Sequence, residues 1–391
     1  MVEKKNKKNC PEIALIDAIY IHIPFCEAKC RYCGFYSEKL SSKNDEIFAS
    51  ALLADLKAQQ NLLAPIAKTI YIGGGTPSAI GSEYLDKILS KLDQFTSDKT
   101  EFTIEANPNS CSKEFVNILA AHKVNRVSLG VQSFSDSELT NLGRIHKASD
   151  ISQAVKSLRM QNIANLSLDL IYGLPDQTLA SWKENLHRAI ELSPDHISCY
   201  SLTIDPNTQF EKLYQAGKLE LISDSLYREM FYCTIETLRQ AGYQHYEISN
   251  FAKPGMQSRH NRVYWKNQPY LGLGPAAASY YNFTRTTNSP DLESYISCIN
   301  ANISVECESE TLTGKSHAAE SLMLNFRLIE GVDISEFVAR FGASPEDLFP
   351  KSFAKYFAMN ILKKQNGKIL VETDWLFVID SLLADILSEA D

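Results

Sequence analysis

Three of the nine cysteines lie close together on one short stretch of the chain. Cys26, Cys30 and Cys33 stand in the segment FCEAKCRYC, directly after a strand expected over residues 18–23. Three thiolates on one loop can bind a common metal centre, either a Zn²⁺ ion with His22 as a fourth ligand or a [4Fe–4S] cluster. Three cysteines leave one iron of such a cluster open to a further ligand. The other six cysteines are scattered, and a buried, inert role is expected for them.

The cysteine loop follows the first of six strands that the sequence predicts. From residue 18 to about residue 201, short β-rich runs alternate with amphipathic segments of helical spacing, which is typical of parallel βα units. Right-handed crossovers then predict an α/β fold, an incomplete TIM-like barrel of six βα units, whose strands carry the chemistry at their carboxyl ends. The expected strands begin at Ala18, Thr69, Glu101, Arg126, Asn165 and His196.

The rest of the chain is expected to form smaller units around this barrel. Residues 1–17 are expected to be an N-terminal extension and residues 18–205 the barrel itself. Residues 206–310, which contain the segment HNRVYW, are expected to complete the barrel. Residues 311–391 are mainly helical and end in a hairpin-like segment, a pattern that resembles a winged helix and favours a packing domain over a nucleic-acid-binding one.

Composition and charge exclude several classes of partner. The chain has 391 residues, and its 39 Lys and Arg against 47 Asp and Glu leave a net charge of -8, which gives no broad attraction to nucleic acid or anionic membranes. No run approaches the roughly 18 apolar residues of a spanning helix, and no signal-peptide core follows the basic start. We therefore expect a cytoplasmic protein with reduced thiols and no nucleic-acid partner.

Glycine and polar residues also follow the other expected strands. The turn at 73–76 ends the second strand with three glycines and Thr76, and glycines expose backbone N–H and C=O groups to a ligand. Glu105, after the third strand, can accept hydrogen bonds from a ribose or an amino group. Further polar residues at or beyond the fourth and fifth strands are Gln132, Ser133, Arg144 and Asp169. Their coincidence at one end of the barrel predicts a ligand site opposite the cysteine loop.

The spacing C-x3-C-x2-C on such a loop resembles that of radical S-adenosylmethionine (SAM) enzymes. From Tyr20 onward the chain resembles the family of oxygen-independent coproporphyrinogen III dehydrogenases and their HemW relatives, in the motifs YIHIPFC, GGGTP, IEANP, GVQSF and DLIYGLP. The resemblance implies that Cys26, Cys30 and Cys33 bind a [4Fe–4S] cluster. The SAM contacts that it implies are Tyr20, Gly74, Gly75, Thr76, Glu105, Gln132, Arg144 and Asp169.

Two features separate the branches of this family. The dehydrogenases carry a fourth cysteine where this chain has Phe35, and a long arm ahead of the motif where this chain has 19 residues before Tyr20. The segment HNRVYW, at 260–265, resembles the HNxxYW signature of HemW haem chaperones. Imidazole is a common haem ligand, and aromatic rings offer flat apolar surface to a porphyrin. The haem contacts implied by this match are His260, Asn261, Tyr264 and Trp265.

The resemblance thus implies a haem chaperone that binds haem, a [4Fe–4S] cluster and SAM and delivers haem to an acceptor protein. The resemblance does not identify the acceptor protein, for which a respiratory protein is one candidate. An electron donor is needed only if SAM is cleaved. Whether the chain forms a homodimer is not predicted. The alternative is an enzyme that decarboxylates coproporphyrinogen III to protoporphyrinogen IX by radical chemistry. Because Phe35 argues against this alternative, coproporphyrinogen dehydrogenase activity is not expected.

Overall fold

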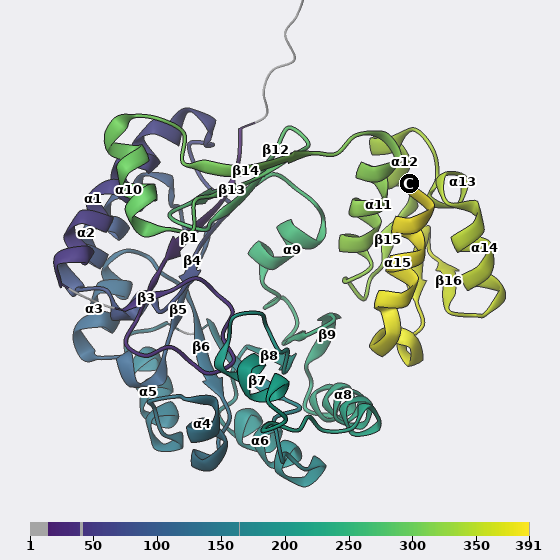
Figure 1. Cartoon of the computed structure of the whole chain (residues 1–391), viewed down its shortest axis with the longest axis horizontal. Coiled ribbons are helices and arrows are strands. Elements are labelled where there is room, and N and C mark those ends of the chain that lie inside the picture. Colours follow the sequence, from purple (N-terminus) through teal and green to yellow (C-terminus); the bar gives the residue numbers. More distant parts are fainter. Residues whose placement is uncertain (1–14, 40–41, 164, 391) are drawn as a thin grey trace, which may run out of the picture.

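The computed structural model describes residues 15–39, 42–163 and 165–390, so most of the expected N-terminal extension lies outside the described residues. Its main sheet has nine strands in the order β11-β1-β4-β5-β6-β7-β8-β10-β9 and curves into an open barrel (Figure 1). This confirms the expected α/β partial barrel. Six neighbouring strands run parallel: β1 (Ala18–Ile23), β4 (Thr69–Gly74), β5 (Glu101–Ala106), β6 (Arg126–Gln132), β7 (Asn165–Tyr172) and β8 (His196–Ser201).

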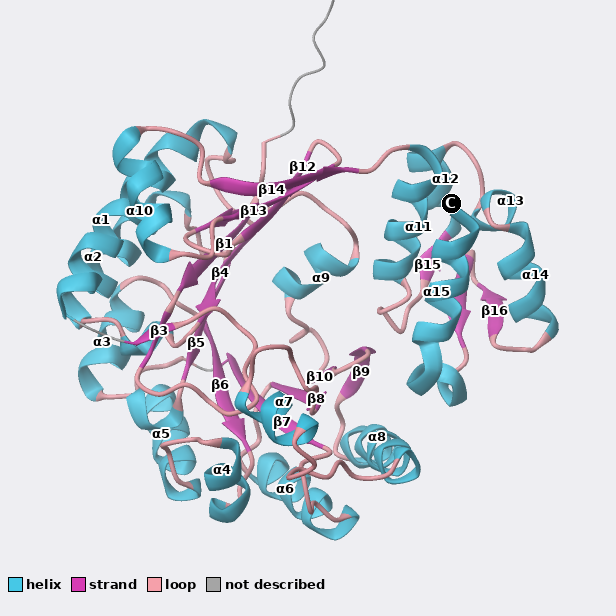
Figure 2. Cartoon of the chain, in the orientation of Figure 1, coloured by secondary structure: helices cyan, strands magenta, loops and turns pink. Residues whose placement is uncertain are grey.

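Helices cover the outer face of this sheet, as Figure 2 shows. Alternate strand residues, such as Ile19 and Ile70, are fully buried against the apolar faces of the helices, where Phe48 and Trp182 belong to the same core. The other residues of each strand face the barrel interior, and many of them are polar. The covering helices are α1 (Ser42–Gln59), α2 (Ser82–Leu92), α3 (Lys113–Ala121), α4 (Asp136–Leu142), α5 (Ala148–Met160), α6 (Leu179–Glu191) and α8 (Asp224–Gln240).

The tract at 206–310 supplies strands to both edges of the main sheet. Its strand β11 (Leu271–Leu273) pairs parallel to β1, whereas β10 (Asn250–Ala252) pairs antiparallel to β8 and carries β9 (Gln244–Glu247) at the outer edge. Between these edges lies α9 (Arg259–Trp265), which closes part of the open side (Figure 1). The remaining elements of the tract are α7 (Gln209–Gln215), β12 (Ala278–Tyr281), β13 (Thr284–Asn288), α10 (Leu292–Ala301) and β14 (Glu306–Thr311).

The last part of the chain packs around a core of its own, in which Phe326, Phe349 and Phe353 are buried. A small sheet in the order β15-β17-β16 lies among its helices. No helix among the described residues is long and apolar enough to cross a membrane. The elements are α11 (Gly314–Asn325), β15 (Val332–Asp333), α12 (Ile334–Phe341), α13 (Pro345–Leu348), α14 (Pro350–Ala358), β16 (Leu362–Gln365), β17 (Lys368–Val371), the 3-10 helix η5 (Thr373–Val378) and α15 (Ile379–Ala390).

Candidate cofactor site

The three cysteines lie on the loop between β1 and α1, at the carboxyl end of the first strand. Short strands fix both ends of this loop, because β2 (Phe25–Cys26) pairs with β3 (Glu38–Lys39). Phe25 is fully buried and packs edge to face on Phe48, with ring centroids 5.2 Å apart. The N–H of Thr76 donates to the carbonyl of Phe25 at 2.7 Å. The loop therefore lies directly beside the glycine turn of β4.

A chain of hydrogen bonds connects two of the cysteines through residues from other strands. Cys26 Sγ lies 3.5 Å from Thr76 Oγ1, which accepts a hydrogen bond from Asn107 Nδ2 at 3.1 Å. Arg144 donates to Asn107 Oδ1 through Nη2 and to Cys30 Sγ through Nη1, the latter at 3.3 Å. Asn107 is not among the predicted contacts, although its position two residues after Glu105 in IEANP is the signal that identifies it.

The donor set of this loop fits a [4Fe–4S] cluster. Burial raises the pKa of the Cys26 and Cys33 thiols, so these thiols hold their protons until iron displaces them. The Arg144 guanidinium provides the compensating positive charge. In the described part of the chain, no three His, Cys, Asp or Glu side chains are close enough together to hold a single metal ion. Thiolates of a [4Fe–4S] cluster each bind a different iron and need not converge on one point.

Replacing Arg144 should change the redox properties of this cluster. We expect Arg144→Met to lower the reduction potential by several tens of millivolts, because it removes a positive charge and a hydrogen bond from Cys30. An EPR-monitored redox titration of the reconstituted protein measures the shift. Arg159→Met is the control, since Arg159 is exposed and its guanidinium donates to the backbone carbonyls of 192–193. Equal potentials in the two variants would contradict the assigned contact.

The glycine turn after β4 brings bare backbone against the cysteine loop. Gly74 has a φ of 110°, in the region that favours glycine. A Cβ on Gly75 would lie 2.6 Å from the carbonyl oxygen of Phe25, and one on Gly73 would lie 2.8 Å from the carboxylate of Glu105. Side chains at these positions are therefore excluded. Such exposed backbone suits the amino and carboxylate groups of a bound amino acid, as the predicted contacts at Gly74 and Gly75 require.

Glu105 lies inside the barrel between the glycine turn and Tyr71. The Tyr71 hydroxyl donates to Oε1 at 2.7 Å, and the Gly74 N–H donates to Oε2 at 3.3 Å. Burial raises the pKa of Glu105 to about 7, and the neighbouring Asp169 carboxylate contributes to the rise. The charged form of Glu105 accepts hydrogen bonds from a ligand most strongly, and the raised pKa moves its formation toward neutral pH.

We expect Glu105→Gln to stabilise the protein and to weaken SAM binding. Folded Glu105 keeps its proton up to about pH 7, whereas the ordinary value is 4.5, so the wild-type protein loses stability as pH rises through this window. The variant should gain on the order of 2 kcal/mol in unfolding free energy at about pH 8 and nothing at about pH 4. Its SAM affinity should fall about tenfold.

Denaturant unfolding at both pH values and equilibrium dialysis of labelled SAM measure these two effects. Glu83→Gln is the matched control, because Glu83 is exposed and only pairs with Lys87 on the surface of α2. A Glu105→Gln variant that is as stable as the wild type at high pH would contradict the buried, costly carboxylate.

Asp169 and Gln132 extend the polar interior toward β6 and β7. Three serine hydroxyls, on three neighbouring strands, donate to the Asp169 carboxylate at 2.9, 3.2 and 2.7 Å: Ser128, Ser167 and Ser198. Gln132 ends β6 with a φ of 63°, at a shift in the β6–β7 register, and strained backbone of this kind clusters at ligand sites. A Cβ on Gly130 would meet the side chains of Gln132, Arg144 and Asn107 within 3.2 Å, so these three side chains converge.

Tyr20 and His22 form the side of the site on β1. The Tyr20 hydroxyl lies 3.1 Å from His22 Nδ1, and His22 Nε2 lies 3.2 Å from the carbonyl oxygen of Tyr36. Burial lowers the pKa of His22 to about 4, so the ring is neutral. Both nitrogens of His22 thus have partners other than a cysteine. The Zn²⁺ alternative, with His22 as fourth ligand, finds no support in this arrangement.

The HNRVYW segment forms α9, whose first turn is anchored to the barrel by Glu101. The buried Glu101 carboxylate accepts the N–H groups of Arg259 and His260, both at 2.9 Å. Ser258 Oγ caps the helix by accepting the N–H of Asn261 at 3.3 Å. A carboxylate at a helix amino terminus also complements the helix dipole. The motif is therefore held rigidly at the amino-terminal end of β5.

His260 is fully enclosed, with an exposed fraction of 0%. Its Nδ1 lies 2.8 Å from Thr69 Oγ1, and its Nε2 lies 2.8 Å from the Tyr264 hydroxyl. The Tyr71 ring stacks on the imidazole at a centroid distance of 5.2 Å. Burial lowers the pKa of His260 to about 3, so the imidazole is neutral. Since Tyr71 also contacts Glu105, one side chain joins the predicted haem motif to the predicted SAM site.

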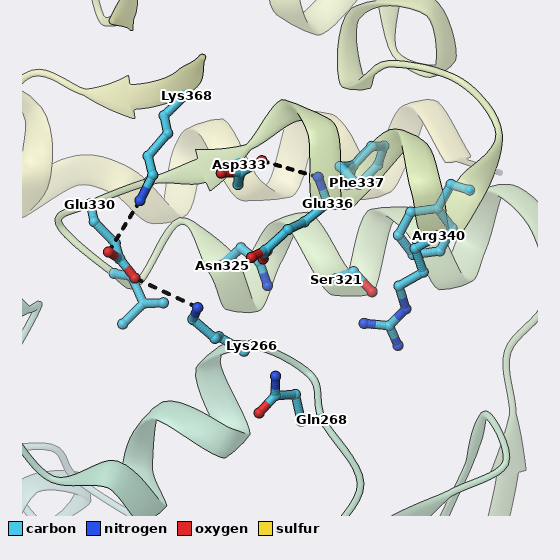
Figure 3. Close-up of a pocket in the computed structure, with 13 residues that line it drawn as sticks. Lys266, Gln268, Ser321, Asn325, Glu330, Asp333, Glu336, Phe337, Arg340 and Lys368 are labelled. Carbon is cyan, nitrogen blue, oxygen red and sulfur yellow. Dashed lines mark hydrogen bonds and ion pairs between the residues drawn. The ribbon is translucent and has the colours of Figure 1, made fainter. Parts of the chain in front are cut away.

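The other end of α9 is tied to the C-terminal domain, as Figure 3 shows around Glu330. Asn325 of α11 donates to the carbonyl of Trp265 at 2.8 Å. Trp265 Nε1 is buried and has no hydrogen-bond partner among the described residues. Trp265 therefore lies at the junction of the two domains. Three cations lie 2.6, 4.0 and 3.1 Å from the Glu330 carboxylate: Arg262, Lys266 and Lys368.

A cavity of about 350 Å³ lies between the cysteine loop and α9. Of the four predicted haem contacts, Tyr264 lines this cavity, and His260, Asn261 and Trp265 do not. Phe35 lines it from the cysteine loop, with 70% of its surface exposed. The other aromatic and imidazole side chains of its wall are Tyr20, His22, Tyr36 and Tyr270. The cavity was not predicted, because its walls come from segments that are far apart in the sequence.

Comparisons with known proteins identify the domains and the fold. The family profile described as the Radical SAM superfamily matches residues 20–189, and the HemN C-terminal domain profile matches residues 312–372. The solved structure of coproporphyrinogen III oxidase (HemN) from Escherichia coli, described as a radical SAM enzyme, superposes with a TM-score of 0.82 at 22% identity, over 96% of this chain and 91% of that chain. Residues 20–189 thus match the radical SAM class, and the fold of the chain is that of the HemN structure.

Curated relatives narrow this class to one family. Heme chaperone HemW of Bacillus subtilis is 38% identical over 85% of this chain and 88% of its own length. Heme chaperone HemW of Synechocystis is 39% identical over 81% and 79%, and that of Escherichia coli is 36% identical over 85% and 88%. The chain belongs to the heme chaperone HemW family.

Proposed function

We propose that this protein is a haem chaperone that binds haem, a [4Fe–4S] cluster and SAM and delivers haem to an acceptor protein. The observation that carries the proposal is the membership of the HemW family, in a chain whose HNRVYW segment packs against the barrel. Cys26, Cys30 and Cys33 would hold the cluster, and the eight predicted contacts would hold SAM. When bound together, these groups supply electron-transfer and radical chemistry.

The residues of this chain would orient the ligands rather than react with them. Tyr71 contacts both His260 and Glu105, so a haem bound at α9 and a SAM bound at the strand ends share one supporting side chain. The proposed compartment is the cytoplasm, where thiols stay reduced and free to bind iron. The proposed acceptor is a haem protein of the respiratory chain. An electron donor acts only if SAM is cleaved. Sedimentation of the loaded protein tests whether it forms a homodimer.

Transfer of haem to an acceptor tests the delivery step. Haem-loaded protein is mixed with a purified respiratory b-type cytochrome from which haem has been removed, and the two are separated and analysed by their Soret absorbance. The proposal predicts that haem moves to the cytochrome and that an equal amount of loaded serum albumin transfers less. Equal transfer from albumin would contradict a dedicated chaperone.

The second candidate function is oxidative decarboxylation of coproporphyrinogen III. The likeness to the fold of HemN favours it, whereas Phe35, in place of the expected extra cysteine, does not. An anaerobic assay of the reconstituted protein with SAM, a reductant and coproporphyrinogen III separates the two functions. Formation of protoporphyrinogen IX would replace the chaperone proposal, and unchanged substrate is the expected result.

A further inference from the structure

We propose that haem occupies the cavity between the cysteine loop and α9, and that the Tyr264 oxygen, rather than a His260 nitrogen, binds its iron. This inference rests on the proposed haem-binding function and names the position and the ligand atom of the haem. His260 then acts through Tyr264 as a positioning residue.

The surroundings of His260 leave no nitrogen free for iron. Both ring nitrogens are engaged at 2.8 Å, one by Thr69 and the other by Tyr264. Tyr71 covers one face of the ring, and the side chain has no exposed surface. An iron at either nitrogen would have to displace a buried hydroxyl and leave it without a partner, which is costly inside a protein. The imidazole is thus built into the barrel wall.

Tyr264 is the residue of the motif that reaches a ligand-sized space. It lines the cavity of about 350 Å³, within the range of volumes found for small-molecule sites. Its ring packs edge to face on Tyr270, with centroids 4.6 Å apart. Phe35 also lines this cavity and is 70% exposed, so a flat apolar ligand would cover it. Aromatic walls of this kind suit a porphyrin face.

The hydrogen bond from His260 prepares Tyr264 to bind ferric iron. Tyrosine is an established type of haem ligand in proteins. On binding, the phenolic O–H bond breaks, an Fe–O bond forms, and the proton leaves to solvent. If the Thr69 hydroxyl donates to Nδ1, the neutral imidazole carries its proton on Nε2 and donates it to the phenolate oxygen across the same 2.8 Å contact. No buried imidazolium is needed.

The other tyrosines of the cavity are less suited to this role. The Tyr20 hydroxyl faces His22 Nδ1, but His22 Nε2 lies against the Tyr36 carbonyl, which can only accept. The neutral His22 ring therefore has no proton left for a Tyr20 phenolate. The Tyr36 hydroxyl donates to the carboxylate of Glu38, whose charge would repel a phenolate. The Tyr270 hydroxyl accepts a hydrogen bond from Arg285 at 3.0 Å, which would stabilise a phenolate, but Tyr270 is more buried than Tyr264. The Tyr270 variant is therefore included in the test.

The test compares ferric haem complexes of the wild-type protein with Tyr264→Phe, Tyr270→Phe and His260→Gln by absorbance titration and resonance Raman spectroscopy. We expect the wild type and Tyr270→Phe to show the phenolate-to-iron charge-transfer band and Fe–O vibration. Tyr264→Phe should lose both and bind haem about 10-fold more weakly. His260→Gln should keep the band at reduced affinity. Tyr232→Phe is the control, because Tyr232 lines a different cavity and donates to the Asp374 carbonyl.

The outcomes separate the inference from the function on which it rests. Absence of haem binding by the wild type overturns the proposed function. Two results overturn the inference but leave the proposed function intact. One is a phenolate-to-iron charge-transfer band that survives in Tyr264→Phe, and the other is imidazole ligation of the haem iron that is lost in His260→Gln. If a buried variant fails to fold, Phe35→Ala still tests the cavity, because it should weaken haem binding several-fold. Phe283→Ala, an exposed phenylalanine outside the cavity, should not.

Discussion

Replacement of Cys26, Cys30 or Cys33 by serine should abolish the iron–sulfur cluster. We expect each anaerobically reconstituted variant to hold less than about a tenth of the iron of the wild type, because each thiolate binds a separate iron of the cluster. The loop is fixed at both ends by the β2–β3 pair. Between these ends the loop contains no further cysteine that could take the vacant position. Iron and acid-labile sulfide analysis, with visible absorbance, measures the loss.

Cys307→Ser is the control for these variants, because Cys307 is far from the loop in the sequence and is exposed on β14, so the buried role expected for it is wrong. It should retain full iron content. Zinc is measured in the same samples, since a triad that binds Zn²⁺ would lose zinc instead of iron. A loop variant with full iron occupancy would contradict the assignment of the cluster ligands.

Replacement of Gly75 by valine should disable both the glycine turn and the cysteine loop. The added Cβ would lie 2.6 Å from the carbonyl oxygen of Phe25, so one of the two backbone segments must shift. Phe25 is fully buried and cannot yield without disturbing Phe48. We expect a loss of about 3 kcal/mol in unfolding free energy and a fall of at least about 100-fold in SAM affinity.

Denaturant unfolding and equilibrium dialysis with SAM measure the two effects of Gly75→Val. Gly242→Ala is the control, since a Cβ there meets nothing within 4 Å and only the φ of 87° is strained. That control should lose only about 1 kcal/mol and bind SAM normally. Normal SAM binding by Gly75→Val would show that the turn does not contact the ligand.

The six parallel strands of the barrel could be predicted because each is a short apolar run between polar segments. Every expected strand begins at the observed residue, from Ala18 in β1 to His196 in β8. The edge strands β9, β10 and β11 could not be predicted in this way. Each has only three or four residues, and strands this short depend on pairing with their neighbours rather than on their own pattern.

The site could be predicted only as far as the strand ends identify it. Position along the barrel predicts Glu105, Gln132 and Asp169, and the structure places all three on the barrel interior. The partners of His260 could not be predicted, because Thr69 lies 191 positions away in the chain. The sequence of a motif does not show whether its histidine faces a ligand or is enclosed by other side chains. The haem contacts at α9 therefore remain a prediction.

Haem titration of the anaerobically reconstituted wild-type protein tests the proposed haem binding most directly. The titration follows the Soret band of the protein with its cluster intact, and unbound haem is removed on a desalting column before the haem content is determined. We expect saturation at about one haem per chain, in keeping with the one proposed haem site in the cavity that Tyr264 lines. A protein that contains its cluster but retains no haem on the column would contradict the proposed haem-chaperone function.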